Sequence, residues 1–133
     1  MGINDKMRVQ LGTVSHFSIG VADPVASAAW WVSNFDLDEW SRSDKGILLG
    51  NDAIMLGLFK GSKVSGVIGH LGFRTSDIDT LRVARDVLRA NGVDLEDPGN
   101  EIGPVGPGSA SVGLWFHDPD GYRWELYVEG PDT

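Results

Sequence analysis

The chain has 133 residues, of which 41% are hydrophobic, and its formal net charge is −8. This length and apolar content support one domain with a real core. An acidic chain without a basic cluster argues against binding to nucleic acid or to anionic membranes. The absence of cysteine excludes disulfides and sulfur-based zinc sites. No apolar run reaches membrane-spanning length and the first residues carry no secretory signal, so we expect a soluble cytoplasmic protein.

The first half of the chain, about residues 14–60, predicts the order strand, helix and three strands. A first strand over 14–21 carries His16 on the face opposite its apolar residues. Asp23-Pro24 predicts a helix start, because Asp caps helix N-termini and Pro suits the first helical position. We expect this helix to reach about residue 33, with an apolar stripe of Val25, Ala28, Ala29 and Val32. The three strands are expected over 37–42, 46–49 and 53–59.

The second half, about residues 70–128, predicts the same order after a Gly-containing linker over 61–69. A strand over 70–75 carries His70 and Arg74 on one face. Ser76 or Asp77 caps a helix over 78–91. A short strand near 93–95 leads into a Gly/Pro-rich loop over 97–111, which is either a mobile lid or a plain connection. A hairpin closes this half.

Both halves open with His, six intervening residues and Asp, as His16 to Asp23 and His70 to Asp77. The same order of elements follows each of these pairs. We interpret this as a duplicated βαβββ unit of roughly 55 residues, which differs from solenoid repeats. The sequence therefore predicts an α+β fold of two modules within a single domain over 1–133.

The closing hairpin is predicted by two aromatic-rich runs that flank Asp118-Pro119-Asp120-Gly121. In the second arm, Trp124, Leu126 and Val128 share one face, while Glu125 and Tyr127 share the other. A carboxylate in so apolar a strand is costly to bury unless something pairs with it.

His16, His70 and Glu125 each lie opposite the apolar face of their strand. If the apolar faces pack on the helices, all three side chains look across the other, concave face of the sheet. Two neutral imidazoles and one carboxylate can bind a divalent metal and leave positions open for substrate or water. The alternative is two half-buried structural histidines and a surface glutamate.

The order His16, His70, Asp118-Pro119-Asp120-Gly121 and Glu125-Leu126 resembles the vicinal oxygen chelate superfamily. This superfamily includes glyoxalase I, extradiol dioxygenases, fosfomycin-modifying enzymes, methylmalonyl-CoA epimerase and bleomycin-binding proteins. The resemblance covers about residues 14–128. It implies two βαβββ modules that form a cup-shaped mixed sheet, the glyoxalase/bleomycin resistance/dihydroxybiphenyl dioxygenase-like fold.

The resemblance also implies one divalent metal ion (Fe, Mn, Ni, Zn, Co or Mg) with His16, His70 and Glu125 as its ligands. Short members similar to this chain are usually homodimers, and they often build each cup from modules of two chains. The sites are then expected at or near the interface.

One departure from glyoxalase I concerns its second carboxylate ligand, which closes the first module's last strand. We expect Met55 at that position, and a thioether is a poor ligand for hard or borderline ions. Two His and one Glu instead match the ligand set of extradiol dioxygenases and fosfomycin-modifying enzymes. Extradiol enzymes also need an acid–base His, but we expect the remaining His117 beside the turn and off the concave face.

Two further residues are weaker candidates. Tyr127 shares a face with Glu125 and would donate a hydrogen bond to a developing oxyanion, or is an ordinary cross-strand aromatic. Arg74 shares a face with His70 and would bind an anionic substrate group, or pairs with an acid at the sheet rim. Glu125 is a candidate base as well as a ligand.

The leading hypothesis is a metal-dependent enzyme that chelates two oxygens of a small substrate. The reaction type stays open among dioxygenase, lyase and glutathione- or thiol-transferase chemistry. The alternative is a metal-free, bleomycin-resistance-like dimer that sequesters an antibiotic or other amphipathic molecule. A third hypothesis is a structural or regulatory module in which both histidines lack a function.

Overall fold

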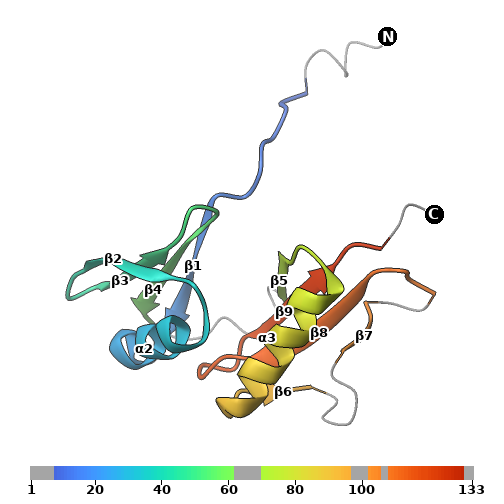
Figure 1. Cartoon of the computed structure of the whole chain (residues 1–133). Helices are drawn as coiled ribbons and strands as arrows, with labels where there is room; N and C mark the ends of the chain where they lie inside the picture. The colour runs from blue at the N-terminus through green and yellow to red at the C-terminus, as the bar shows by residue number, and fades with distance from the viewer. Residues whose placement is uncertain (1–7, 62–69, 97–101, 106–107, 131–133) are drawn as a thin grey trace.

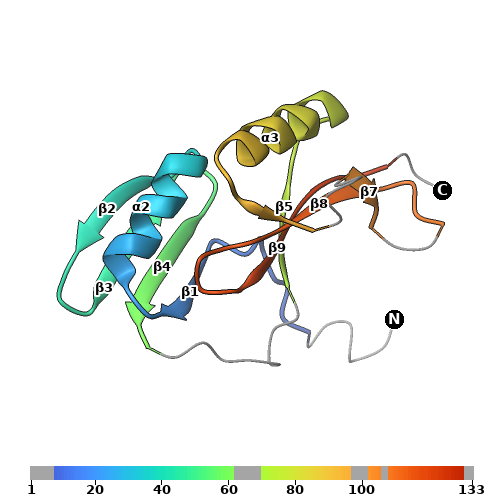
Figure 2. The ribbon, with the colours of Figure 1, turned by 90° about the horizontal axis from the view of Figure 1, so that it is seen from below.

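The computed structural model describes residues 8–61, 70–96, 102–105 and 108–130. Two modules lie side by side, and each is a β-sheet with one helix against a face (Figures 1 and 2). This arrangement confirms the predicted α+β class and the two strand–helix–strand modules.

The first module contains β1 (His16–Val21), α2 (Pro24–Asn34), β2 (Asp38–Arg42), β3 (Gly46–Gly50) and β4 (Met55–Lys60). Its strand order is β1-β4-β3-β2. β1 runs parallel to β4, and the other pairs are antiparallel, so the sheet is mixed. β1 is therefore a free edge of this sheet.

The second module contains β5 (Leu71–Arg74), α3 (Ile78–Ala90), β6 (Asp94–Leu95), β7 (Ile102–Pro104), β8 (Val112–His117) and β9 (Arg123–Val128). Its order is β5-β9-β8-β6, with β7 also paired to β8. β5 runs parallel to β9 and is the free edge, as β1 is in the first module.

One strand departs from the sequence-based prediction. The stretch 97–111 was expected to be a loop, but β7 pairs antiparallel with β8 within it. Its three residues include a Gly and a Pro, which hide the alternation that marks a strand. Of the expected loop, residues 97–101 and 106–107 lie outside the described residues, as do residues 62–69 of the expected linker.

In both modules, the His of the repeated spacing lies at the start of the first strand and the Asp lies at the N-terminus of the helix. Asp23 Oδ1 accepts hydrogen bonds from the backbone N–H groups of Val25 and Ala26. Asp77 Oδ1 accepts one from the N–H of Thr80 at 2.7 Å. Both Asp residues are N-caps, as predicted.

A continuous aromatic core joins the two modules. The Trp31 ring of α2 meets Trp124 of β9 at 4.8 Å between centroids, and both side chains are fully buried. The expected apolar stripe of α2 was partly wrong, since Val25 and Val32 are 54% and 45% exposed. Trp31 determines which face of α2 is buried, because this large side chain packs against the second module.

Asp118 organises the predicted hairpin turn. Its Oδ1 accepts hydrogen bonds from the N–H groups of Asp120 and Tyr122, and its Oδ2 accepts one from Trp124 Nε1 at 2.9 Å. Gly121 has φ of 85°, which suits glycine. The turn thus fixes the start of β9, the strand that carries Glu125.

Candidate metal centre

Glu125 occupies the middle of the outer face of the second sheet, the face away from α3. Its neighbours Trp124 and Leu126 point into the core, as period-two alternation predicts. Glu125 is nonetheless only 7% exposed. Its Oε1 lies 4.0 Å from Nε2 of His70. Its buried Oε2 has no hydrogen-bond partner among the described residues.

Two glycines make room for this carboxylate. Gly72 pairs with Glu125 across the β5–β9 ladder, and Gly113 lies on β8 at the other side. A Cβ at Gly113 would come within 2.6 Å of Oε2, and one at Gly72 would lie 3.4 Å from Oε1. The side chain therefore lies against backbone on both flanks, which explains how a carboxylate is buried on an outer face.

Burial raises the pKa of Glu125 above its ordinary value. The nearby charges of His70 and Arg123 lower this pKa in part but do not cancel the effect of burial. An ionised carboxylate with an unpartnered buried oxygen is unfavourable unless a cation pairs with it.

His70 stands beside a small aromatic and charged cluster. Its ring packs edge to face on Trp115, with centroids 4.7 Å apart. The guanidinium of Arg123 lies 3.9 Å from the centre of the Trp115 ring. Arg123 also donates two hydrogen bonds to the carboxylate of Glu96, at 2.7 and 2.9 Å. The second module thus surrounds the His70–Glu125 pair with ordered groups.

His16, the third predicted ligand, does not join this pair within one chain. It opens β1 as an exposed residue, and its Nδ1 lies 2.9 Å from Ser15 Oγ. Within the described part of the chain, no three His, Asp or Glu side chains are grouped so as to hold a metal. The structure therefore brings together two of the three predicted ligands.

The His70–Glu125 pair fits one side of a divalent metal site. An anionic oxygen without a partner and a half-exposed imidazole are suitable donors for a borderline ion. Two donors leave the coordination incomplete, so the remaining ligand must come from outside this cluster.

The strand register shows which residue of the first module is equivalent to Glu125, and it is not the expected one. Two residues after His70, Gly72 pairs with Glu125; two residues after His16, Ser18 pairs with Gly57. The equivalent of Glu125 is therefore Gly57, whereas Met55 was expected there. This pairing could not be read from the sequence, because the register between β1 and β4 is set only in the folded sheet. The first module still offers no second carboxylate.

Arg74 and Tyr127 face one another at the end of the same outer face. The two residues are paired in the β5–β9 register. A hydrogen bond to Tyr127 and the negative charge of Glu129 raise the pKa of Arg74 above its ordinary value. Arg74 Nη2 lies 3.0 Å from Glu129 Oε1, and both side chains are 61% exposed. Arg74 thus has a rim partner and remains accessible to solvent.

The expected position of His117 was wrong. It pairs with Arg123, two residues before Glu125, and so lies on the same outer face as Glu125. Its Nε2 is 2.8 Å from Glu96 Oε2 and is engaged there rather than at the His70–Glu125 pair. Simple pairing across the four-residue turn 118–121 places His117 opposite Tyr122, whereas the observed register pairs it with Arg123, one residue later, and so reverses its face.

Sequence reasoning missed Arg123 and Glu96. The alternation that placed Glu125 and Tyr127 on one face also places Arg123 there, so a signal existed. Glu96 follows the two-residue strand β6, and its partners His117 and Arg123 come from β8 and β9, much later in the chain. No local pattern identifies such a residue.

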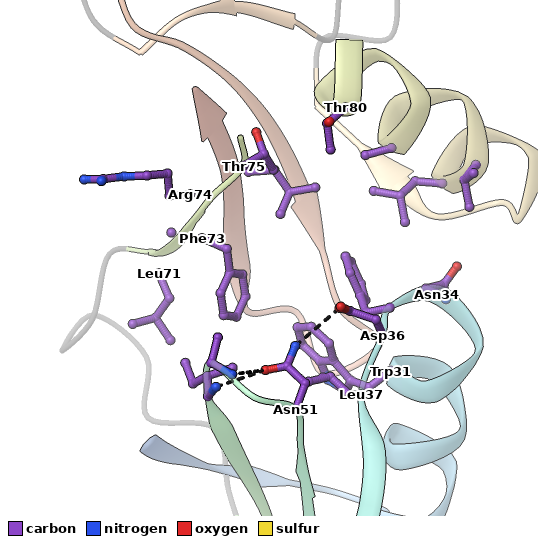
Figure 3. Close-up of a pocket in the computed structure, with 18 of the residues that line it drawn as sticks. Trp31, Asn34, Asp36, Leu37, Asn51, Leu71, Phe73, Arg74, Thr75 and Thr80 are labelled. Carbon is purple, nitrogen blue, oxygen red and sulfur yellow. Dashed lines mark hydrogen bonds between the residues drawn. The ribbon is translucent and has the colours of Figure 1, made fainter. Parts of the chain in front are cut away.

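A groove lies on the helix side, between the first module and α3 (Figure 3). It is an apolar groove of about 830 Å³. Leu71 and Phe73 of β5 and Trp31 of α2 contribute to its walls. Val83 and Val87 of α3 line it while remaining 62% and 44% exposed. The groove follows the free β5 edge, and the three predicted metal ligands do not line it.

The sequence matches the model of the Glyoxalase/Bleomycin resistance protein/Dioxygenase superfamily over residues 13–126. That match covers most of the chain, including both modules. The chain belongs to this superfamily. No curated protein sequence matches it.

Solved structures of this superfamily share the fold at low sequence identity. A glyoxalase/bleomycin resistance protein/dioxygenase from Nocardioides is similar with a TM-score of 0.76 and 16% identity, over 98% of this chain and 94% of that one. A lactoylglutathione lyase from Agrobacterium tumefaciens gives 0.71 and 17%, over 89% and 94%. The fosfomycin resistance protein FosX from Listeria monocytogenes gives 0.68 and 16%, over 90% and 94%.

These neighbours include proteins with different activities, so the likeness establishes the fold and not a reaction. None of the described helices is long and apolar enough to cross a membrane.

Proposed function

We propose that this chain is a cytoplasmic, divalent-metal-dependent enzyme that acts on a small oxygen-bearing substrate. The observation that carries the proposal is the buried Glu125 carboxylate beside the His70 imidazole, whose Oε2 has no hydrogen-bond partner in the described part of the chain. When bound, the ion supplies Lewis acidity to two oxygens of the substrate and stabilises the negative charge that develops on them.

We propose that His16 of a second copy is the third ligand, in a homodimer with two sites. His16 is exposed on the outer face of the first sheet, and the residues that the structure describes provide no group of metal ligands there. His16 is the first residue of β1, and His70 directly precedes β5. A second copy whose His16 approaches His70 of the first must therefore bring its β1 edge near β5 of the first. Neither β1 nor β5 pairs with a further strand among the described residues on its outer side, so both edges can accept such an approach.

The other residues of the outer face have roles that follow from their positions. Glu125 is a ligand that can also accept a proton, because its pKa is raised by burial. Tyr127 donates a hydrogen bond to substrate oxygen, and Arg74 binds an anionic substrate group at the exposed rim. The chemistry is of dioxygenase, lyase or thiol-transferase type.

A second candidate is a metal-free dimer that sequesters an amphipathic molecule. It is favoured by Trp40 and Phe59, which are 54% and 38% exposed. Phe59 shares the outer face of His16, and the Trp40 ring covers Gly50 on that face. Exposed aromatic rings of this kind stack on flat apolar ligands.

Metal analysis separates the two candidates. The protein, purified without chelator, is assayed for bound metal and titrated with Co²⁺, beside His16→Ala, His70→Ala and Glu125→Ala. We expect near-stoichiometric metal in the parent and loss in each variant. Glu39→Ala, at an exposed glutamate paired with Arg42, is the matched control and keeps its metal. A parent that binds no metal, yet changes its tryptophan fluorescence with amphipathic ligands, overturns the enzyme proposal in favour of sequestration.

A further inference from the structure

We propose that Trp115, held in place by Arg123 and Glu96, is a positioning residue that orients the His70 imidazole for metal binding. The inference rests on the proposed metal site and assigns a task to three residues outside the ligand set.

Within the described part of the chain, the His70 ring has few contacts that fix its orientation. Its side chain is 46% exposed, and it precedes β5 rather than lying within the strand. The 4.0 Å between His70 Nε2 and Glu125 Oε1 is too long for a hydrogen bond. The Trp115 ring, in contrast, meets the imidazole at 4.7 Å and an interplanar angle of 76°. Among the described residues, this edge-to-face packing is the ring contact that defines how the imidazole is turned.

Trp115 stands where it can serve both ligands. It lies directly opposite Glu125 in the β8–β9 register. Its indole therefore sits beside the carboxylate and beneath the imidazole, on the outer face rather than in the core. Arg123 lies 3.9 Å from the indole ring centre, a cation–π distance, and prevents the ring from swinging away.

Arg123 is itself fixed by Glu96. The two hydrogen bonds from Arg123 Nε and Nη2 to the two Glu96 oxygens form a bidentate pair. The hydrogen bond from Arg123, above all, keeps the pKa of Glu96 below its ordinary value, so Glu96 stays charged. His117 Nε2 adds a second contact to Glu96 at 2.8 Å. Glu96 thus holds Arg123, Arg123 holds Trp115, and Trp115 orients His70.

Arg123 also acts on Glu125 through its charge, so removing that charge would confuse two effects. Its positive charge lowers the pKa of Glu125. Arg123→Lys keeps the charge but loses the planar fork that pairs with Glu96 and stacks on Trp115. This variant therefore isolates positioning from electrostatics.

The experiment measures Co²⁺ affinity by calorimetry and the visible spectrum of the Co²⁺ form, which reports coordination geometry. The variants are Trp115→Ala, Trp115→Phe, Arg123→Lys and Glu96→Gln. Arg82→Lys is the matched control, because Arg82 makes an exposed ion pair with Asp79 on α3. Thermal unfolding of each metal-free variant is recorded separately.

We expect Trp115→Ala and Arg123→Lys to lose about ten- to a hundred-fold in Co²⁺ affinity, with an altered spectrum. Trp115→Phe retains an aromatic edge and should recover most of that affinity, and Arg82→Lys should match the parent. Variants that unfold at lower temperature but bind Co²⁺ like the parent overturn the positioning role and leave a structural one. A parent that does not bind Co²⁺ overturns the metal site itself.

Discussion

Glu125 Oε2 lies against Gly113 of the neighbouring strand, where a Cβ would come within 2.6 Å of it. Gly113→Ala should therefore push the carboxylate out of its place. We expect a loss of metal affinity of about ten-fold or more, as for other residues that orient ligands. The destabilisation should stay near 1 kcal/mol, since a flexible side-chain end can shift. Isothermal titration with Co²⁺ and urea unfolding measure the two effects.

Gly103 provides the control for this substitution. It pairs directly with Gly113 across β7 and β8, and a Cβ there meets none of the described residues within 4 Å. Gly103→Ala should therefore bind Co²⁺ as the parent does. Equal affinity losses in both variants would show that the effect belongs to the strand pair and not to the carboxylate.

Glu125→Gln tests the cost of burying this carboxylate. Its pKa is raised in the folded protein, so folding favours the protonated form. The stability that this group contributes is present below its ordinary pKa and is lost as the pH rises through the raised value. We expect Glu125→Gln to stabilise the metal-free protein by about 1 kcal/mol at neutral pH, and to have no such effect near about pH 4.

Urea unfolding at the two pH values measures that difference. Added Co²⁺ should stabilise the parent and leave Glu125→Gln unchanged, because only the parent binds the ion. A variant that is less stable than the parent at neutral pH would show that the charge already has a partner.

Asp118 should be the most costly polar residue of the hairpin to replace. Its two oxygens accept three hydrogen bonds, one of them from the buried Trp124 indole. Asp118→Ala leaves these donors without a partner and should lower the free energy of unfolding by about 2–4 kcal/mol. Chemical denaturation of this variant, beside Ala at the exposed Asp44, checks the prediction. A loss as small as that of the Asp44 variant would contradict it.

The groove beside β5 should be covered when two copies associate. If the β1 edge of one copy approaches β5 of the other, the exposed Val83 and Val87 side chains of α3 lie close to the contact. The double variant Val83→Asp/Val87→Asp should be a monomer in sedimentation velocity, because burying an unpaired charge at the interface is costly. Val25→Asp on α2, 54% exposed and away from the groove, should leave the dimer intact. Identical behaviour of both variants would contradict this interface.

The sequence alone was sufficient for the elements whose signals are local. The two caps, Asp23 and Asp77, and the Asp118–Gly121 turn use short-range hydrogen bonds that residue type and spacing reveal. The buried face of α2 was not predictable in this way. It is set by Trp31, which packs against a strand that comes much later in the chain.

The same distinction applies to the candidate site. Alternation placed Glu125 on the face opposite Trp124 and Leu126, and the burial of these two side chains agrees. The folded sheet then brings Glu125 Oε1 to 4.0 Å from Nε2 of His70. The prediction that depended on strand register was wrong, because Gly57, and not Met55, is equivalent to Glu125. Long-range pairing also decided the role of Glu96, which reaches Arg123 from another strand. Such pairings depend on the folded sheet.

The most direct test of a metal site shared by two copies is complementation between inactive variants. His16→Ala and Glu125→Ala chains, carrying different tags, are co-expressed and the mixed dimer is purified and assayed for metal. If His16 of one copy joins His70 and Glu125 of the other, one site of this dimer is intact. The account predicts one metal ion per mixed dimer, whereas each variant alone holds none. The mixed dimer of His70→Ala and Glu125→Ala is the control and should hold none, since both ligands belong to the same module. A His16→Ala/Glu125→Ala dimer without metal, beside a parent that binds it, would contradict a site shared between copies.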